Sequence, residues 1–443
     1  MPFMDKVKSR VIVLTDISSV TGGFKEPDDG QSLVRFLMYA NEFDIEGLIA
    51  THTNHWNGRK PEYIREILEH YGQVHGNLSL HDPAFPRKEE LLRVVKAGNP
   101  HDGREFVGEG HDTEASEWII AAAQKDDQRP LWILVWGGTT DLAQALWRAG
   151  NRNNPEQLAR IVSKLRIYSI SDQYGIGAWI REQHPDLFYI TSYRNYRGMY
   201  KGGDVSLVTA EWLEGNITKQ HGPLGEAYPI YQGGDVYGSK VHGIKEGDTP
   251  TFLYLIPNGL GDSEHPEYGG WGGRFQTAPN GSPCHYFDAV ENLVEEHSDS
   301  ALWASVYRWR PAYQRSFQAR MDWCVKSPEE ANHEPVVSVS GPLRRTVSPG
   351  ERVMISAAGS IDPDGNGLSY SWAVYQEPGS YRGTLVLESG CEQQVMFTAP
   401  QVDTPQTIHI VLSVTNNGLP PMTSYGRIVV TVDPFSEEAV SLE

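Results

Sequence analysis

Residues 11–37 read VIVLTDISSVTGGFKEPDDGQSLVRFL, and this stretch indicates how the rest of the chain folds. Residues 11–14 are valine, isoleucine and leucine, which predicts a buried strand running into Asp16. A pattern of apolar residues with helical spacing starts after Asp28 and Asp29. A carboxylate at a strand tip and a carboxylate pair at the next helix start would meet at one edge of an α/β sheet. Folds of this kind bind ligands at that edge.

Three carboxylates at one mouth repel each other unless a cation or a proton compensates them. A simpler alternative explains part of the pattern, because Asp28 or Asp29 alone would serve as a helix N-cap. Capping accounts for neither Asp16 nor the doubled aspartate. The stretch therefore favours a charged site over a cap alone.

The composition limits the class of protein. A chain of 443 residues is expected to form two or three domains. The net charge of −19, without a basic block, argues against a nucleic-acid or anionic-membrane partner. No apolar run is long enough to span a membrane, and residues 1–10 lack the apolar core of a signal peptide. The protein is therefore cytoplasmic, or a leader is missing from this sequence.

The three cysteines, Cys284, Cys324 and Cys391, have no metal-like spacing. A disulfide between the first two is one alternative, and three buried or free thiols are the favoured one.

Strand and helix patterns alternate through the first part of the chain, as in residues 45–53 followed by 62–71, and 131–138 followed by 142–150. Such repeated units predict an α/β fold with an open, mostly parallel sheet and helices on both faces, which we assign to residues 1–330. Residues 251–256 (TFLYLI) are expected to add a strand. Residues 303–323 are expected to form one or two closing helices around Pro311.

Between about residues 196 and 300 the sequence is rich in Gly, Trp and Tyr and loses its periodicity. Long loops in a compact domain are usually functional or disordered, and this aromatic content argues against disorder. We expect these loops to form a lid or wall over the mouth.

Residues 334–435 contain short alternating segments that predict a β-sandwich of about seven strands, assigned to residues 331–443. The stretch 360–372 resembles polycystic-kidney-disease-type and cadherin-like immunoglobulin modules. One alternative is that its Asp362-Pro-Asp364-Gly turn binds calcium, although most such segments are simply turns. The resemblance implies an accessory module. It also favours a periplasmic or secreted protein over a cytoplasmic one, since such modules mostly sit on exported proteins.

Several polar residues follow strands of the α/β domain and would converge at its mouth. They are Asp16, Asn54, Thr139, Thr140 and Asp262. Hard oxygen ligands without a His or Cys cluster favour Ca²⁺ over Zn²⁺.

Asp16 followed by Asp28 and Asp29 resembles, with an insertion, the first motif of inosine-uridine-type nucleoside hydrolases. The resemblance implies that Asp16 is the catalytic base and a metal ligand. It implies that Asp29 binds calcium and that Asp28 and Asn54 contact sugar hydroxyls. By the same resemblance, Thr140 gives calcium its backbone carbonyl and Asp262 is the last metal ligand.

The whole chain from residue 9 to 435 resembles a bacterial family of cellulose-binding proteins. This family has a nucleoside-hydrolase-like domain and an immunoglobulin-like domain. Two stretches resemble its signature loops, namely YRGMY (residues 196–200) and NGLGDSEHPEYGGWGGRF (258–275).

The chain departs from the nucleoside hydrolases where the leaving group is recognised. Leu14 replaces the first aspartate of the motif, and Gly261-Asp262 stands where a His-Asp pair is expected. Candidates for a replacement acid are His52, His55, His184, His242 and His265. Each is more often a structural residue, and His265 is the preferred one. Trp56, Trp271 and Tyr268 are candidates for stacking on the ligand, with plain packing as the alternative. Arg274 is a further candidate for contacting the substrate, and pairing with a carboxylate is its alternative role.

Two functions remain open from the sequence. The first is a Ca²⁺-dependent hydrolase of a ribosyl or other furanosyl bond, in which Asp16 activates water. The second is a non-catalytic protein that binds cellulose or another polysaccharide. The retained carboxylates favour the hydrolase, and the loss of the leaving-group histidine favours the binder. The expected ligand is a small molecule or oligosaccharide. The sequence leaves open whether the chain forms a homo-oligomer.

Overall fold

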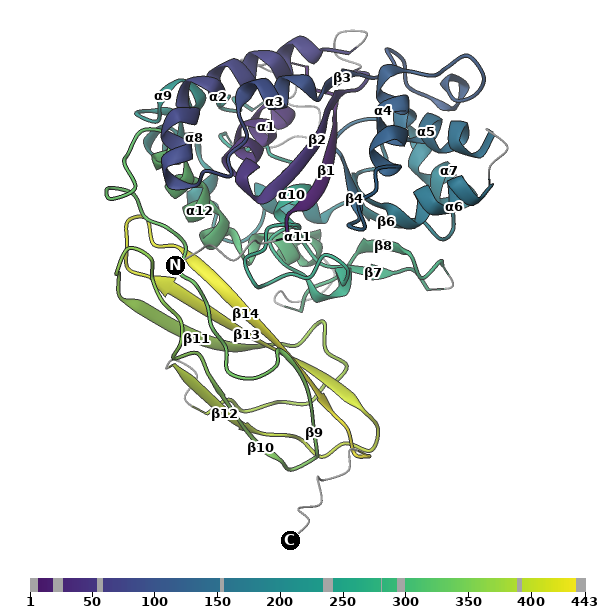
Figure 1. Cartoon of the computed structure of the whole chain (residues 1–443). Helices are drawn as coiled ribbons and strands as arrows, with labels where there is room; N and C mark the ends of the chain where they lie inside the picture. The colour runs from purple at the N-terminus through teal and green to yellow at the C-terminus, as the bar shows by residue number, and fades with distance from the viewer. Residues whose placement is uncertain are drawn as a thin grey trace.

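A computed structural model describes residues 7–18, 27–53, 59–151, 155–233, 242–279, 281–292, 299–388 and 393–435. The chain folds into an α/β domain and an elongated β-sandwich that lies against one side of it (Figure 1). No helix in the described ranges is long and apolar enough to cross a membrane. Cys284 and Cys324 are free thiols, and Cys391 lies outside the described residues.

The α/β domain is built on an eight-stranded sheet of order β3-β2-β1-β4-β5-β6-β8-β7. Only β7 runs antiparallel to its neighbour, so the predicted mostly parallel sheet is confirmed. Its strands are β1 (Ser9–Thr15), β2 (Phe43–Ala50), β3 (Val95–Ala97), β4 (Leu131–Val135), β5 (Leu165–Ile170), β6 (Phe188–Ser192), β7 (Phe275–Thr277) and β8 (His285–Asp288).

Strand β1 lies between β2 and β4, and the strand order reverses there. A reversal of this kind opens a crevice at the C-terminal ends of the two strands, because the chain leaves them in opposite directions. We call the C-terminal edge of the sheet at β1 and β4 the mouth.

The alternation of side chains along β1 builds both hydrophobic cores of the domain. Val11 and Val13 face one core, and Ile12 and Leu14 face the other. All four are fully buried, as expected for a central strand covered on both faces. The first core contains residues of α1, α2, α10 and α12, and the second contains residues of α4, α5, α6 and α7.

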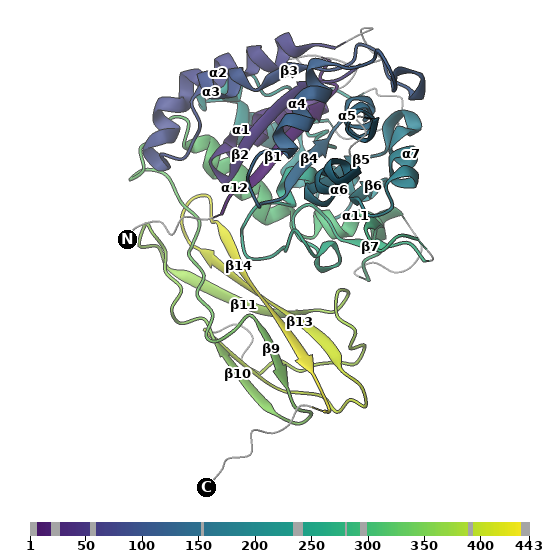
Figure 2. The ribbon, with the colours of Figure 1, turned by 45° about the vertical axis from the view of Figure 1, so that its right-hand side comes forward.

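Helices therefore cover both faces of the sheet, as the alternating pattern predicts (Figure 2). They are α1 (Asp28–Met38), α2 (Pro61–His81), α3 (Lys88–Arg93), α4 (Glu114–Ala123), α5 (Thr140–Asn151), α6 (Pro155–Lys164), α7 (Ile176–Gln183), α8 (Ala210–Leu213), α9 (Gly222–Glu226), α10 (Pro250–Leu253), α11 (Asp299–Tyr307) and α12 (Arg310–Asp322).

One expected element is wrong. Residues 251–256 do not form a strand, because the helix α10 starts at Pro250 and includes the first three residues of this stretch. Proline is well suited to the first position of a helix, so the Thr-Pro pair that precedes TFLYLI marks a helix start. The two closing helices are confirmed as α11 and α12, with Pro311 in the first turn of α12.

The sandwich contains a two-stranded sheet, β10-β12, and a four-stranded sheet, β11-β13-β14-β9. The described strands are β9 (Arg344–Val347), β10 (Arg352–Ser356), β11 (Leu368–Tyr375), β12 (Gln394–Thr398), β13 (Gln406–Asn416) and β14 (Thr423–Val432). At the start of the stretch predicted to form short strands, Val336 forms an isolated bridge with Ile361. The predicted domain boundary at residue 330 falls between the end of α12 and the start of β9.

Residues 258–274, which we call the docking segment, join the two domains. The backbone N–H of Tyr425 donates to the carbonyl of Asn258 (2.8 Å), and Arg427 Nε donates to that of Leu260 (2.6 Å). Gly259 has φ +84°, and a Cβ there would lie 2.0 Å from the carbonyl oxygen of Tyr425. Gly259 therefore allows close packing against β14, and the segment is not a lid over the mouth.

Candidate metal centre

The centre begins at the first turn of α1, which carries Asp28 and Asp29 at the mouth. The hydroxyl of Thr15, the last residue of β1, donates a hydrogen bond to the buried Asp29 carboxylate. Asp29 also shares a hydrogen bond with the side chain of Asp16. Two carboxyl groups make such a bond only when one of them holds a proton. The structure thus places Asp16 beside the aspartate pair, as the sequence predicts.

A second segment, residues 243–249, lies along α1 and is attached to it by polar side chains. Gln31 Oε1 accepts a hydrogen bond from the backbone N–H of Lys245 (2.7 Å). Arg35 Nε pairs with Glu246 Oε2 at 2.7 Å, and both side chains are fully buried. These contacts fix the register of the segment against the helix, so the aspartate two residues after Glu246 has a defined position.

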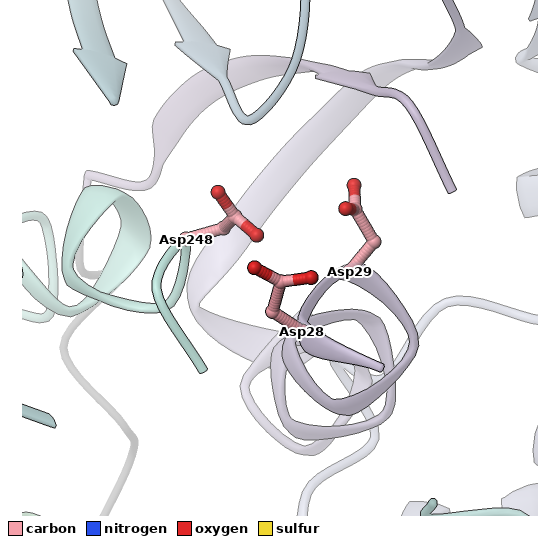
Figure 3. A group of neighbouring side chains, drawn as sticks. All are labelled: Asp28, Asp29 and Asp248. Carbon is pink, nitrogen blue, oxygen red and sulfur yellow. The ribbon is translucent and has the colours of Figure 1, made fainter. Parts of the chain in front are cut away.

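That residue is Asp248, which faces Asp28 and Asp29 (Figure 3). One carboxylate oxygen from each of the three lies within 4.8 Å of the others. Asp29 and Asp248 are each 3% exposed. Oxygens bonded to one calcium ion at about 2.3–2.6 Å lie up to roughly 5 Å apart across the ion. The spacing of the three oxygens therefore fits a single shared cation.

Burial makes this concentration of negative charge costly. Burial, and after it the charge of the neighbouring Asp28, raises the pKa of Asp29 to about 7. Burial also raises the pKa of Asp28, against the opposing charge of Lys245. In the described part of the chain, the buried Oδ1 of Asp28 has no hydrogen-bond partner. Protons or a cation would compensate these carboxylates, and a divalent ion would satisfy charge and ligand capacity together.

The loop after β4 is shaped to admit Asp16. A Cβ on Gly137 would lie 2.7 Å from the carboxylate of Asp16, so a residue with a side chain would displace it. Thr140 begins α5 three residues later, and its hydroxyl donates a hydrogen bond to Asp102. Asp102 in turn lies against Gly138, where a Cβ would clash with its Oδ2. The Gly137-Gly138 pair therefore makes room for two carboxylates beside the mouth.

Asp262 does not belong to the cluster. It lies in the docking segment, is 38% exposed at its side chain and pairs with Arg344 Nη2 at 2.9 Å. The prediction assumed that Asp262 follows a strand that ends at the mouth, whereas the preceding element is the helix α10. Asp248 precedes that helix and supplies the third carboxylate.

His265, Trp271 and Arg274 also lie in the docking segment, away from the carboxylate cluster. The His265 ring stacks on Tyr268 with centroids 4.5 Å apart. Trp271 Nε1 donates to the hydroxyl of Tyr425 on β14 (3.4 Å).

Arg274 pairs with the buried Glu291, which also accepts a hydrogen bond from Tyr375 on β11. Side chains expected at a ligand wall thus hold the two domains together. An aromatic, glycine-rich loop has the same composition whether it lines a ligand site or packs between two domains. Composition therefore does not distinguish these two roles.

Asn54 and Trp56 lie outside the described residues. Asp248 and Lys245 are not among the site residues that the sequence predicts. The signal for Asp248 was present as Asp-Thr-Pro, an acidic residue just before a proline that starts a helix.

The comparisons with known proteins agree with this architecture. Residues 10–275 match the family described as cellulose-binding Sde182, nucleoside hydrolase-like domain. The chain belongs to this family. Residues 352–432 match the C-terminal domain of the cellulose-binding protein Sde0182.

A solved structure from Saccharophagus degradans resembles this member of the Sde182 family over nearly its whole length. It is described as a nucleoside hydrolase-related hypothetical protein associated with carbohydrate metabolism. The identity is 34%, the TM-score is 0.81, and the match covers 96% of this chain and 100% of that one.

Smaller similarities involve immunoglobulin-like and cadherin-like domains. A PKD domain from the KIAA 1837 protein is 18% identical, with a TM-score of 0.18, over 23% of this chain and 92% of its own. Cadherin domains of protocadherin gamma B7 are 15% identical, with a TM-score of 0.13, over 20% of this chain and 23% of their own. Among curated proteins, none is similar enough to this chain to count as a match.

Proposed function

We propose that this chain is a carbohydrate-binding protein whose α/β domain binds a sugar at a divalent cation in the mouth. The observation that carries the proposal is the cluster of Asp28, Asp29 and Asp248, with oxygens within 4.8 Å of one another. The family is described as cellulose-binding, and the relative from Saccharophagus degradans as associated with carbohydrate metabolism. Both descriptions support a sugar as the ligand.

We take the cation to be Ca²⁺, since carboxylate and carbonyl oxygens without His or Cys ligands suit it best. Asp29 and Asp248 would hold it, together with Asp16 and the backbone carbonyl of Thr140. The ion would supply a Lewis-acid contact to a pair of sugar hydroxyls.

The chain's own groups complete the sugar site in this proposal. Asp28 stands at the edge of the cluster and would accept a hydrogen bond from a sugar hydroxyl through its buried, unpartnered Oδ1. Asn54 and Trp56 remain proposed contacts on the strength of the sequence.

A second candidate function is hydrolysis of a glycosyl bond, and the position of Asp16 beside Asp29 favours it. Asp16 would take a proton from water as the water oxygen bonds to the anomeric carbon. The glycosidic bond breaks in the same step, and the leaving group must receive a proton. The histidine predicted to donate that proton, His265, stacks on Tyr268 in the docking segment instead. This placement ranks binding ahead of hydrolysis.

Two parallel assays test the proposal on the full chain. Retention on insoluble cellulose and calorimetry with cellotetraose should both show binding in calcium and weaker binding after chelation. No binding of either probe in calcium would contradict the proposal. A panel of nitrophenyl furanosides and nucleosides, with Asp16→Asn as the control, decides whether hydrolysis accompanies binding. Turnover that Asp16→Asn abolishes would establish the second function.

A family that binds cellulose meets its ligand outside the cytoplasm. We therefore extend the proposal to a periplasmic or secreted location, which fractionation of the source cells would test.

A further inference from the structure

Lys245 is a buried lysine whose backbone position is fixed from both sides. Its N–H donates to Gln31 on α1, and Gly243, two residues earlier, exchanges two backbone hydrogen bonds with Tyr231 (2.8 and 2.9 Å). The residue is only 7% exposed. Removing an ammonium group from water is costly unless its surroundings compensate the charge.

Two aromatic rings and one carboxylate provide that compensation. The ammonium of Lys245 lies 5.2 Å from the ring centroid of Tyr200 and 5.0 Å from that of Tyr231. Both distances are in the range of cation–π attraction. Among the charges that act on Asp28, Lys245 has the largest effect. The ammonium is therefore held at the Asp28 end of the cluster.

Gly247 borders the Asp28 end of the cluster. Gly247 lies between Lys245 and Asp248 in sequence, and a Cβ there would lie 3.7 Å from Asp28 Oδ2. On the same side it would lie 3.3 Å from the Tyr196 ring. The absence of a side chain at residue 247 keeps this approach to Asp28 open.

We propose that Lys245 is a sugar-contacting residue that donates a hydrogen bond to the hydroxyl from which Asp28 accepts one. This inference deepens the proposed function and rests on it. A hydroxyl group donates one hydrogen bond and accepts others, so an adjacent carboxylate and ammonium suit it well.

The charges around the site select the class of sugar. Four carboxylates, Asp16, Asp28, Asp29 and Asp248, would face one divalent ion and the ammonium of Lys245. The carboxylates then outnumber the positive charges by one, so no excess positive charge remains to attract an anion. The site therefore fits a neutral sugar better than a uronic acid or a sugar phosphate.

The experiment is calorimetry on the full chain with calcium alone and then with cellotetraose, D-ribose or D-glucuronate in saturating calcium. Lys245→Met should weaken binding of the neutral sugar that the wild type binds by about tenfold or more. It should leave calcium affinity unchanged or tighter, because a positive charge beside Asp28 is lost. Lys201→Met is the matched control, because Lys201 also lies over the Tyr200 ring, at 6.0 Å, and its affinities should match the wild type.

A loss of sugar affinity without a loss of calcium affinity is the signature of a sugar contact, since a structural defect would weaken both together. Lys245→Gln provides a second variant of polar character and should behave as Lys245→Met does. Unchanged sugar binding in both variants, or a parallel fall of both affinities, would overturn the role of Lys245. Preference for D-glucuronate would overturn the assignment to neutral sugars. Absence of any sugar binding in the calcium-loaded wild type would instead refute the proposed function itself.

Discussion

Asp248 and Asp262 each follow a glycine in a polar loop near the C-terminal end of the α/β domain. Asp248 lies in a segment that α1 holds through Gln31 and Arg35, which brings its carboxylate to Asp28 and Asp29. Asp262 lies in a segment held by the sandwich, where Arg344 neutralises it. The neighbouring elements therefore decide which of two similar Gly-Asp pairs serves the cluster.

Exchanging each aspartate for asparagine separates the two roles. Asp248→Asn should weaken calcium binding by roughly a hundredfold, because a buried charged ligand is lost. Asp262→Asn should leave the affinity within about twofold of the wild type, since its carboxylate is outside the cluster. Calorimetric titration of calcium measures both. Equal losses in the two variants would mean that the ligand assignment is wrong.

The pH dependence of stability follows from Asp29. Its pKa is about 7 in the folded protein and 3.8 when unperturbed, so the native state holds a proton that the unfolded chain releases between these values. The free energy of unfolding of the cation-free protein should therefore fall as the pH rises from about 4 to about 7.

Thermal denaturation in a chelator at a series of pH values measures this dependence, with Asp29→Asn as the control. The difference between wild type and variant isolates the contribution of Asp29, which should diminish with rising pH. Calcium should restore stability above neutral pH, because it binds the ionised carboxylates. A contribution of Asp29 that grows with pH in the chelator would contradict the pKa shift.

At the scale of elements, Gly259 in the docking segment lets the segment pack closely against β14. Gly259→Ala should lower the free energy of unfolding by roughly 2–4 kcal/mol, because φ is positive and the added carbon would meet the Tyr425 carbonyl. Gly76→Ala in α2 is the matched control. A Cβ there meets nothing within 4 Å, so helix propensity should add about 0.5–1 kcal/mol. Chemical denaturation measures both, and a neutral Gly259→Ala would contradict the close approach.

Elements with strong periodicity could be predicted from sequence, and elements whose role depends on distant partners could not. The strand at residues 9–15 and the helix after Asp28 follow from local pattern and burial. The stretch that contains α10 predicts a strand because its run of five apolar or aromatic residues looks alike in either form. Misplacing that element shifted the predicted ligand from Asp248 to Asp262. Trp271 contacts Tyr425 on the distant strand β14, and Arg274 is linked to Tyr375 on β11 through Glu291, which sequence spacing does not reveal.

At the scale of the whole molecule, the two domains share a buried polar interface and should unfold together at neutral pH. His409 on β13 lies in that interface, with its ring against Tyr268 (4.6 Å between centroids) and Nδ1 3.2 Å from Arg427 Nη1. Burial, then the charges of Arg427, Arg344 and His265, lowers its pKa from 6.5 to about 3. The stability gained by keeping His409 neutral is present above about pH 6.5 and lost as the pH falls toward 3.

Acidification from about pH 7 to about pH 4 should therefore weaken the docking of the sandwich and separate the unfolding transitions of the two domains. Differential scanning calorimetry detects the separation. His409→Asn removes the titrating group and should reduce the pH dependence of the transition. The assignment fails if the variant shows the same acid-induced separation as the wild type.

The central claim is that Asp29 and Asp248, which lie more than 200 residues apart in the chain, hold one divalent cation at the mouth. The most direct test is anomalous diffraction from crystals grown in calcium, measured at a wavelength where calcium scatters anomalously. We predict a peak about 2.3–2.6 Å from carboxylate oxygens of both residues. No peak at these carboxylates, or a peak only at the Asp362-Pro-Asp364 turn of the sandwich, would contradict the claim.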